Sequence, residues 1–581
     1  MKVKHFLAGM LFATAMLTAS VADACTNFLF TKGATKDGST MITYAADSHT
    51  LYGELYYRRV ADYPAGTMFM VVDWDSGRPL FEIPQAAHTY NVVGNMNEHQ
   101  LAIGETTYGG RKELGGARGI DYGSLIYITL QRAKNAREAI KTIAELMDTY
   151  GYGSSGESFS ICDPNEVWVM ELIGKGKFEY DTVKGKPVLK KQYKGFREGA
   201  VWVARRIPDG YVCGHANQAR ITTFPLATKK STNVITSKNL DKIFNPEVEC
   251  VYSDDVITFA RMKGYFSGKD EEFSFADTYA PLDFSGMRGC DARVYAMFAR
   301  VKEGIRDQYA DYALGRNPSN RLPLWIKPDH KIDVHEAMNL MRDHYEGTPL
   351  DMTQDVGAGP FKCPYRWRPM DFEIDGHTYV HERATSTQQT GFSFVAQCRG
   401  WLPNKVGGIL WFGVDDTYTT VYCPMYCGLT EIPECFRQGN GSLTEWSETA
   451  AFWLFNRVSN FAYSRYADMI VDIQREQNDL EKGFIDEVNK NDKRLAESSE
   501  QEVVMLTNDL SARMAKRMMQ QWTKLDHFLL MKYIDGNVKH HHGYDLDKTE
   551  TGNCAWPDQP KYPEWFYRMI IKDHGDVIIE K

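Results

Sequence analysis

The residues around Cys25 constrain this chain most, because they decide where the folded protein begins. The chain opens with a basic stretch and an apolar run over residues 6–17, and small residues then stand at Ala22 and Ala24. This is the A-x-A pattern that signal peptidase reads. The sequence therefore predicts that residues 1–24 are a signal peptide and that the mature protein, which begins with Cys25, is exported to a periplasmic or extracellular space.

A cysteine at position one carries both a thiol and a free α-amine, whose ordinary pKa values are about 8.5 and about 7.7–8.0. The amine can then act as general base for the thiol of the same residue, directly or through one water. Two other interpretations of Cys25 stay open: a structural or disulfide cysteine, and the lipid-bearing first residue of a surface lipoprotein. A lipoprotein signal would have Leu three residues before the cysteine, where this chain has Ala22.

Cys25 also opens a series of short motifs that follow one another along the chain. The motifs lie at 25–30 (CTNFLF), 36–41 (KDGSTM), 46–48 (ADS), 97–98 (NE), 104–107 (GETT), 156–161 (GESFSI), 215–221 (HANQARI), 342–348 (RDHYEGT), 389–392 (QTGF) and 411–416 (WFGVDD). Their content and order resemble the secernin-like dipeptidases, a family of cysteine N-terminal-nucleophile (Ntn) hydrolases. The resemblance covers residues 25–427.

The resemblance implies an exported cysteine peptidase that hydrolyses short peptides, most often dipeptides, and needs no metal or organic cofactor. Cys25 would attack the scissile carbonyl, and its own α-amine would take up and return the proton. The implied fold class is α+β, a four-layer α/β/β/α sandwich of the Ntn-hydrolase kind. Because this chemistry would serve any amide, an amidase of the penicillin acylase or bile-salt hydrolase kind stays open. So does a non-enzymatic lipoprotein whose sandwich is a binding module.

For Asp47, the resemblance implies a hydrogen bond with the α-amine of Cys25. A hairpin of predicted strands at 26–30 and 39–45 would return Asp47 toward the start of the first strand. The family commonly has an arginine three residues before this aspartate, and this chain has Tyr44 there. No contact of that arginine is therefore carried over, and a plain turn carboxylate is the alternative for Asp47.

Five more residues are candidates for the site. Asn217 matches the family's oxyanion donor, and a side-chain amide can stabilise a tetrahedral oxyanion. Glu105 and Thr106 end a predicted strand and are candidates for the substrate and oxyanion region. Arg220 and Arg293 are candidates for a third member, because an arginine steadies the thiolate in related acylases. The alternatives are a loop asparagine, a threonine that only packs, and solvated arginines.

Composition argues against several functions. The net charge of −9 gives the chain no electrostatic reason to bind nucleic acid. After residue 24 no apolar run approaches the ~18–20 residues of a membrane span. No CxxC pair or HExxH motif occurs, so we expect no metal site, and the tract at 540–542 (HHH) is not tied to chemistry. The eleven cysteines are expected to be mostly buried structural thiols, some of them paired.

The length of 581 residues predicts a large core with an appended region. A catalytic domain is expected over 25–440, with helices at 122–133 and 135–147 between groups of strands. Short β-rich runs, including 68–72, are expected to join the same sheets.

After residue 440 the pattern becomes helical, and 441–581 is predicted to be a helical appendage. Capping boxes at Ser442 with Glu445 and at Ser499 with Glu502 are expected to open two of its helices. We expect this appendage to pack on the catalytic domain or on a second copy of the chain, which would make a homo-oligomer.

Overall fold

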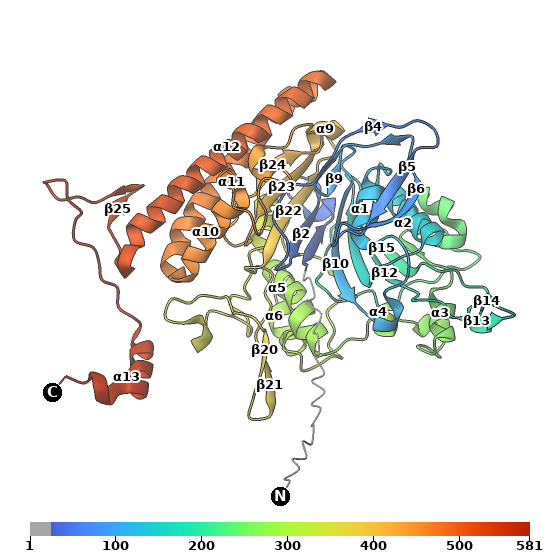
Figure 1. The fold of residues 1–581 in the computed structure, drawn as a ribbon, viewed down its shortest axis with the longest axis horizontal. Coiled ribbons are helices and arrows are strands. Elements are labelled where there is room, and N and C mark those ends of the chain that lie inside the picture. Colours follow the sequence, from blue (N-terminus) through green and yellow to red (C-terminus); the bar gives the residue numbers. More distant parts are fainter. Residues whose placement is uncertain (1–24, 581) are drawn as a thin grey trace, which may run out of the picture.

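The computed structural model describes residues 25–580, so the predicted signal peptide lies outside the described residues. Two large sheets form its centre (Figure 1). The seven-stranded sheet contains, in spatial order, β19 (Trp325–Ile326), β16 (Val212–His215), β1 (Asn27–Phe30), β2 (Thr40–Asp47), β22 (Thr390–Cys398), β23 (Gly408–Val414) and β24 (Cys423–Tyr426). The nine-stranded sheet contains β17 (Val234–Thr236), β18 (Cys250–Tyr252), β15 (Ala200–Arg206), β12 (Val167–Gly174), β11 (Gly156–Cys162), β10 (Ala102–Gly109), β9 (Met96–Asn97), β8 (Val92–Val93) and β3 (Tyr57–Arg58).

The two sheets lie against each other through β1 and β2 on one side and β10 and β11 on the other. Asn27 of β1 is hydrogen-bonded to Ser160 of β11, with 2.9 Å between the amide and the hydroxyl. Gly104 of β10 permits this close approach, since a Cβ there would stand 3.0 Å from the Asn27 amide nitrogen. The strands that follow Cys25 are therefore held directly over the strand that carries Glu105.

Helices α1 (Tyr122–Leu130) and α2 (Ala136–Tyr150) pack on the nine-stranded sheet. Asn135 caps α2 as predicted, because its side chain accepts a hydrogen bond from the Glu138 backbone at 3.0 Å. The apolar stripe of α2, including Ile140 and Ile143, shares one buried cluster with strand residues such as Trp168. The two predicted helices are thus confirmed at nearly their predicted positions.

Further helices border the seven-stranded sheet. α5 (Ala292–Val301) packs on β16, and α8 (Val334–Leu340) packs on β22. The remaining short helices are α3 (Val256–Met262), α4 (Phe275–Tyr279), α6 (Ile305–Gln308), α7 (Ala310–Ala313) and α9 (Asn404–Gly407). Mixed helices and sheets of this kind agree with the predicted α+β class.

The C-terminal part contains the long helices α10 (Ala451–Tyr463), α11 (Tyr466–Glu497) and α12 (Glu500–Tyr533), which pack beside β23 and β24 (Figure 1). Phe455 of α10 stacks on Trp522 of α12, with 4.6 Å between the ring centroids. Both rings belong to the same buried cluster as Phe28 of β1 and Phe412 of β23. These helices therefore share one hydrophobic core with the seven-stranded sheet. The end of the chain adds the hairpin β25 (His541–His542) with β26 (Asp545–Leu546) and α13 (Glu564–Ile578).

Besides β25 with β26, four small two-stranded sheets lie outside the large ones. They are the pair β4 (Ala61–Asp62) with β7 (His88–Thr89) and the hairpins β5 (Met68–Val72) with β6 (Pro79–Pro84), β13 (Tyr180–Val183) with β14 (Lys186–Leu189), and β20 (Asp371–Ile374) with β21 (His377–Val380). The run at 68–72 is a strand, but its predicted place in a core sheet is wrong. β5 pairs only with β6, because residues 73–78 turn the chain straight back.

The two predicted capping boxes of the C-terminal part have different outcomes. Ser499 opens α12 as predicted, and the Glu502 side chain accepts from the Ser499 backbone at 2.9 Å. The prediction at Ser442 is wrong. The backbones of Ser442 and Glu445 pair with each other in a tight turn, so the helix begins only at α10.

All eleven cysteines lie in the described part of the chain, and all are free thiols there, so none of the expected pairs is formed. Cys162 of β11 and Cys398 of β22 come nearest to pairing, with 3.7 Å between their sulfur atoms. Within residues 25–580, no helix combines the length and the apolar character that crossing a membrane requires.

One buried ion pair joins α11 to the sheet core, and its removal is a test of the fold. Glu481 accepts from the Arg342 guanidinium and from the Tyr422 backbone at 2.9 Å. Glu481→Ala would leave Arg342 buried without its carboxylate, so we expect a loss of about 3–5 kcal/mol in the free energy of unfolding. Urea unfolding followed by circular dichroism measures this. Lys482→Ala, at the exposed neighbour, should change stability by less than about 0.5 kcal/mol. Equal effects of the two substitutions would contradict the packing described here.

Candidate active site

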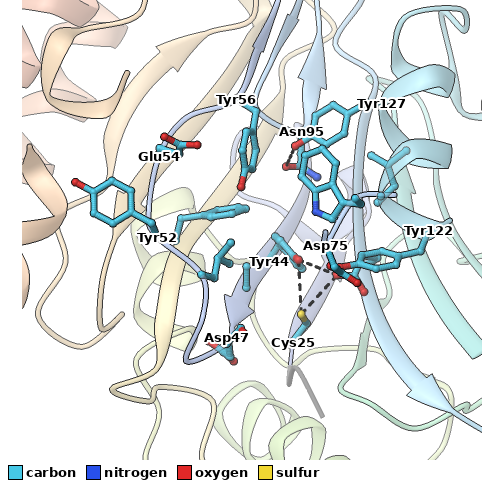
Figure 2. Close-up of a pocket in the computed structure, with 18 of the residues that line it drawn as sticks. Cys25, Tyr44, Asp47, Tyr52, Glu54, Tyr56, Asp75, Asn95, Tyr122 and Tyr127 are labelled. Atoms are coloured by element: carbon cyan, nitrogen blue, oxygen red, sulfur yellow. Dashed lines mark hydrogen bonds between the residues drawn. The ribbon is translucent and has the colours of Figure 1, made fainter. Parts of the chain in front are cut away.

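Cys25 lines a pocket of about 430 Å³ (Figure 2). Its position follows from the hairpin, since Cys25 lies two residues before the first residue of β1 and β2 returns the chain past it. Seven of the 23 residues that line the pocket are aromatic: Tyr44, Tyr52, Tyr56, Trp74, Tyr122, Tyr127 and Phe392. A pocket of this size and lining suits a small organic molecule.

The Cys25 sulfur has two polar neighbours. It lies 3.5 Å from Glu105 Oε1 and 3.6 Å from the Tyr44 hydroxyl, which donates to the same Glu105 oxygen at 2.7 Å (Figure 2). Burial raises the pKa of the Cys25 thiol well above its usual range, and the charges of Glu105 and Asp47 raise it further. The hydrogen bond with Tyr44 lowers the pKa of the thiol, but by less than burial and the two charges raise it. The thiol is therefore protonated at neutral pH and needs a base before it can act as nucleophile.

A second buried carboxyl group, Glu157 of β11, lies behind Glu105 and is within its electrostatic reach. Thr107 donates to Glu157 Oε1 at 2.9 Å, because the two residues pair across β10 and β11. Burial raises the pKa of Glu157 well above its usual range, and the charge of Glu105 adds to the shift. Sequence reasoning did not single out Glu157, although its pairing opposite Thr107 follows from the alignment of two predicted strands.

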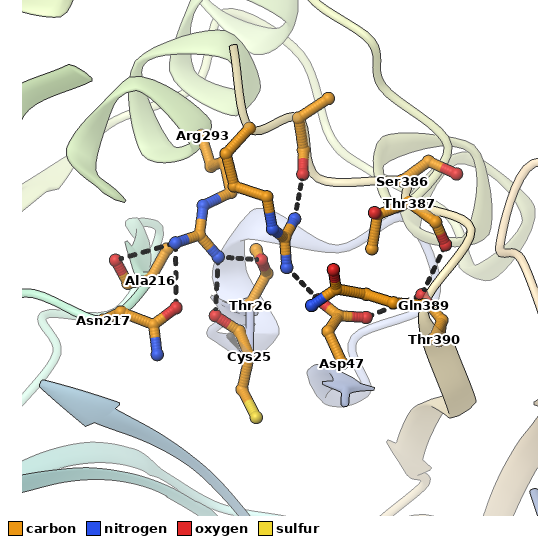
Figure 3. A network of polar contacts seen from close by, with 12 residues as sticks. Cys25, Thr26, Asp47, Ala216, Asn217, Arg293, Ser386, Thr387, Gln389 and Thr390 are labelled. Carbon is orange, nitrogen blue, oxygen red and sulfur yellow. Dashed lines mark hydrogen bonds and ion pairs between the residues drawn. The ribbon is translucent and has the colours of Figure 1, made fainter. Parts of the chain in front are cut away.

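The guanidinium of Arg293 holds the main chain at Cys25 (Figure 3). One of its nitrogens donates to the Cys25 carbonyl and to the Thr26 hydroxyl, both at 2.8 Å. The other donates to the Asn217 side-chain oxygen at 2.8 Å. Arg293 is only 1% exposed and stands at the start of α5, so a helix packed on the seven-stranded sheet positions this cation.

Asn217 follows β16 and has a left-handed backbone with φ of +54°, a conformation that asparagine tolerates better than most residues. Its amide nitrogen donates to the Thr107 carbonyl at 2.6 Å, while its oxygen accepts from Arg293. Arg293 thereby links the Asn217 side chain to the Cys25 carbonyl. Figure 3 shows Asn217 and Asp47 on opposite sides of the Cys25 main chain.

Both oxygens of the Asp47 carboxylate, at the end of β2, accept hydrogen bonds. One oxygen accepts from Arg383 and the other from the Thr390 hydroxyl, both at 2.6 Å (Figure 3). Burial raises the pKa of Asp47, and the charge of Arg383 offsets part of this shift. Arg383 and Thr390 orient Asp47, and no local pattern predicts these contacts, since both residues lie more than 330 positions further along the chain.

Two of the candidates point elsewhere. Thr106 is fully buried and its hydroxyl lies 3.0 Å from His215 Nδ1, whereas its neighbour Thr107 lines the pocket. Burial and then the charge of Arg220 lower the pKa of His215 to about 3, so this histidine is neutral. Arg220 donates to the Gly214 and Pro323 carbonyls and touches none of the pocket groups described above. The structure therefore brings together Cys25, Asp47, Glu105, Asn217 and Arg293. Thr106 touches this group only at Asn217, whose backbone N–H donates to the Thr106 hydroxyl at 3.3 Å, and Arg220 lies outside it. Within residues 25–580 no three His, Cys, Asp or Glu side chains are grouped to hold a metal ion.

The contact between Glu105 and the thiol can be tested without substrate. Glu105→Gln removes a charge that raises the pKa of the Cys25 thiol, so the thiolate fraction at pH 8 should rise. Because the thiolate is the reactive form, iodoacetamide should alkylate Cys25 roughly threefold to tenfold faster. Peptide mass spectrometry follows Cys25 apart from the other cysteines. Glu54→Gln, in the same pocket but not in contact with the thiol, is the matched control. An unchanged or slower rate in Glu105→Gln would refute this account of the thiol.

Comparison with known proteins identifies the family. The family model described as Peptidase family C69 matches residues 24–479, more than half of the chain. A "Probable dipeptidase B" of Streptococcus pyogenes serotype M1 is 22% identical over 509 residues, which cover 83% of this chain and 87% of the relative. A "Probable dipeptidase" of Latilactobacillus sakei is 21% identical over 463 residues, which cover 76% of this chain and 82% of that relative. A "Probable dipeptidase" of Salmonella dublin is 21% identical over 454 residues, which cover 74% of this chain and 86% of that relative. The family predicted from the motifs is confirmed: the chain belongs to peptidase family C69 and is a peptidase.

Proposed function

We propose that this protein is an exported dipeptidase whose nucleophile is the thiol of Cys25, made competent when signal cleavage frees the α-amine of the same residue. The observation that carries the proposal is the contact set of Cys25: its thiol lines the pocket while its backbone is held by Arg293 between Asp47 and Asn217. The names of the relatives, probable dipeptidases, support dipeptides as the substrate class.

The first chemical step is proton transfer from the Cys25 thiol to its α-amine. Burial and Glu105 raise the pKa of the thiol, so an attack at neutral pH needs a base beside the sulfur. The amine formed by cleavage before Cys25 provides one on the same residue. Asp47, already oriented by Arg383, would accept a hydrogen bond from the resulting ammonium and stabilise its charge.

In the second step the thiolate attacks the carbonyl between the two residues of the substrate. The Asn217 amide and a backbone N–H would donate to the oxyanion of the tetrahedral intermediate, and such a donor contributes about 2.7–4 kcal/mol to transition-state stabilisation. The ammonium of Cys25 returns its proton to the leaving amine. Water, activated by the same amine, then hydrolyses the thioester and frees the first residue.

We also infer that the two sheets and their helices form the four-layer α/β/β/α sandwich of Ntn hydrolases. The contact of β2 with β10 and the packing of α1, α2 and α5 support this. In the proposed organisation residues 25–440 are the catalytic domain and 441–581 the helical region. We also propose that two copies associate through that region and that the protein lies in a periplasmic or extracellular space.

The proposal requires an unblocked Cys25, which separates it from its alternatives. A chain beginning Met-Ala before Cys25 should fold, because added terminal residues disturb little buried surface. It should hydrolyse dipeptides at least about a hundredfold more slowly than the processed protein, since an amide nitrogen is no base. Turnover of a dipeptide panel, with penicillin V and a conjugated bile salt beside it, measures both activity and substrate class.

Protease treatment that leaves Cys25 first should restore turnover, and Cys25→Ala should stay inactive under both treatments. Circular dichroism of each protein controls for folding. Full activity of the extended, demonstrably uncleaved chain would exclude the N-terminal mechanism. A mature N-terminus that carries lipid would favour the lipoprotein alternative, and a preference for penicillin V or the bile salt would favour an amidase.

A further inference from the structure

The hairpin of β5 and β6, which belongs to neither large sheet, reaches the pocket with its turn. Three consecutive residues at the start of α1 hold it there. Tyr122 donates to Asp75 at 2.9 Å, Ser124 donates to the Val72 carbonyl at 2.7 Å, and Trp74 covers Gly123. A Cβ on Gly123 would lie 2.3 Å from the indole, so only glycine permits this contact.

Aromatic packing fixes the turn further. Trp74 stacks on Tyr127 with 4.7 Å between ring centroids and meets the edge of Tyr56 at 5.0 Å. The turn itself is closed by Asp73, which accepts from the Ser76 backbone at 2.9 Å. Asp75 therefore enters the pocket on a rigid support, and Figure 2 shows its carboxylate beside Tyr122 and near the Cys25 thiol.

Asp75 gives the thiol end of the pocket a concentrated negative charge. The pKa of Tyr122 is raised by burial first and then by Glu105, Asp75 and Glu157, so all three carboxyl groups act on one ring. Glu157 is 1% exposed, and its Oε2 has no hydrogen-bond partner among the described residues. A carboxylate can accept about four hydrogen bonds, so the bond from Tyr122 does not prevent Asp75 from binding an ammonium group.

Elsewhere in the pocket stands a cation, Arg58 of β3. Its guanidinium donates to the Tyr57 carbonyl at 3.0 Å and to Gln438 at 3.5 Å, and lies 5.7 Å from the Tyr127 ring centroid. No carboxylate of the described residues lies within 4.0 Å of it. The nearby pocket residue Glu54 instead accepts from the Gly439 backbone at 2.8 Å. The pocket thus offers negative charge beside the nucleophile and one guanidinium on a different strand.

We propose that Asp75 and Arg58 select the substrate by the charges at its two ends: Asp75 binds the α-ammonium group and Arg58 binds the C-terminal carboxylate. The assignment rests on the proposed function, because attack by Cys25 on the first carbonyl brings the substrate's ammonium to the same end of the pocket. That ammonium is separated from the attacked carbon by one atom, so it must lie near Glu105 and Asp75. The second residue then extends along the aromatic wall toward Arg58. A peptide blocked at either end loses one of the two ion pairs.

Binding to the processed Cys25→Ala protein tests the assignment without catalysis. The probes are Ala-Phe, N-acetyl-Ala-Phe and Ala-Phe amide, and isothermal titration calorimetry gives each Kd. Asp75→Asn should raise the Kd of Ala-Phe and of Ala-Phe amide at least about tenfold and leave the Kd of N-acetyl-Ala-Phe unchanged. Arg58→Gln should raise the Kd of Ala-Phe and of N-acetyl-Ala-Phe at least about tenfold and leave the Kd of Ala-Phe amide unchanged. The substitution is made at Asp75 and not at Glu105, because Glu105 also raises the pKa of the Cys25 thiol.

Matched controls lie on the same elements. Glu82→Gln is a carboxyl-to-amide change on β6 outside the pocket, and Arg59→Gln alters the exposed neighbour of Arg58. Both should bind all three probes like the parent. Failure of Ala-Phe to bind the parent, or a variant that weakens blocked and unblocked probes equally, would overturn the assignment. If the binding pattern holds but the processed enzyme with Cys25 does not cleave Ala-Phe, the proposed function fails while the assignment stands.

Discussion

The buried guanidinium of Arg293 is the contact on which the site depends. It donates to the Cys25 carbonyl, the Thr26 hydroxyl and the Asn217 side chain, so one planar group fixes the main chain of the nucleophile and the residue proposed to stabilise the oxyanion. Burial lowers the pKa of Arg293, and the charge of Arg383 nearby lowers it further. Its hydrogen bonds to carbonyl and side-chain oxygens offset the loss of hydration. A neutral side chain of similar size could not hold the same three acceptors.

The fold explains why these groups meet. Cys25 is joined to β1, Asp47 ends β2, and Arg293 begins α5 on the outside of the same sheet, whereas Glu105 comes from the facing sheet. The thiol is buried apart from its contact with the pocket, and this burial keeps it protonated until a base is available. In the proposed mechanism signal cleavage supplies that base only after the chain has been exported.

Local signals allowed good predictions where neighbours along the chain decide the structure. The hairpin after Cys25, the Asn135 cap of α2 and the Ser499 capping box depend on residues a few positions apart, and each is found in the structure. The box at Ser442 was wrong because the same Ser and Glu spacing also fits a closed turn.

Contacts between distant segments could not be predicted in this way. Asp47 is paired with Arg383, which lies in the loop before β22, and Glu105 acts on Glu157 across the neighbouring strands β10 and β11. No local pattern specifies either contact. The β5–β6 hairpin shows the same limit, since the β-rich run at 68–72 predicts a strand but not its partner. Thr106 and Arg220 were suggested by motif position alone, and their side chains make structural contacts away from the thiol. The family motifs point to Thr106, whereas the neighbouring Thr107 lines the pocket, so packing decides which of two adjacent residues faces it.

The most direct test of the account is to trap the acyl group on the nucleophile. Alanine p-nitrophenyl ester acylates quickly, so hydrolysis of the thioester should limit turnover and the acyl-enzyme should accumulate. Acid quench during turnover by the processed enzyme, followed by mass spectrometry of its N-terminal peptide, locates the adduct. The account predicts an alanyl group on the Cys25 sulfur, removed by hydroxylamine and absent from Cys25→Ala. An alanyl group on any other side chain during productive turnover would contradict it.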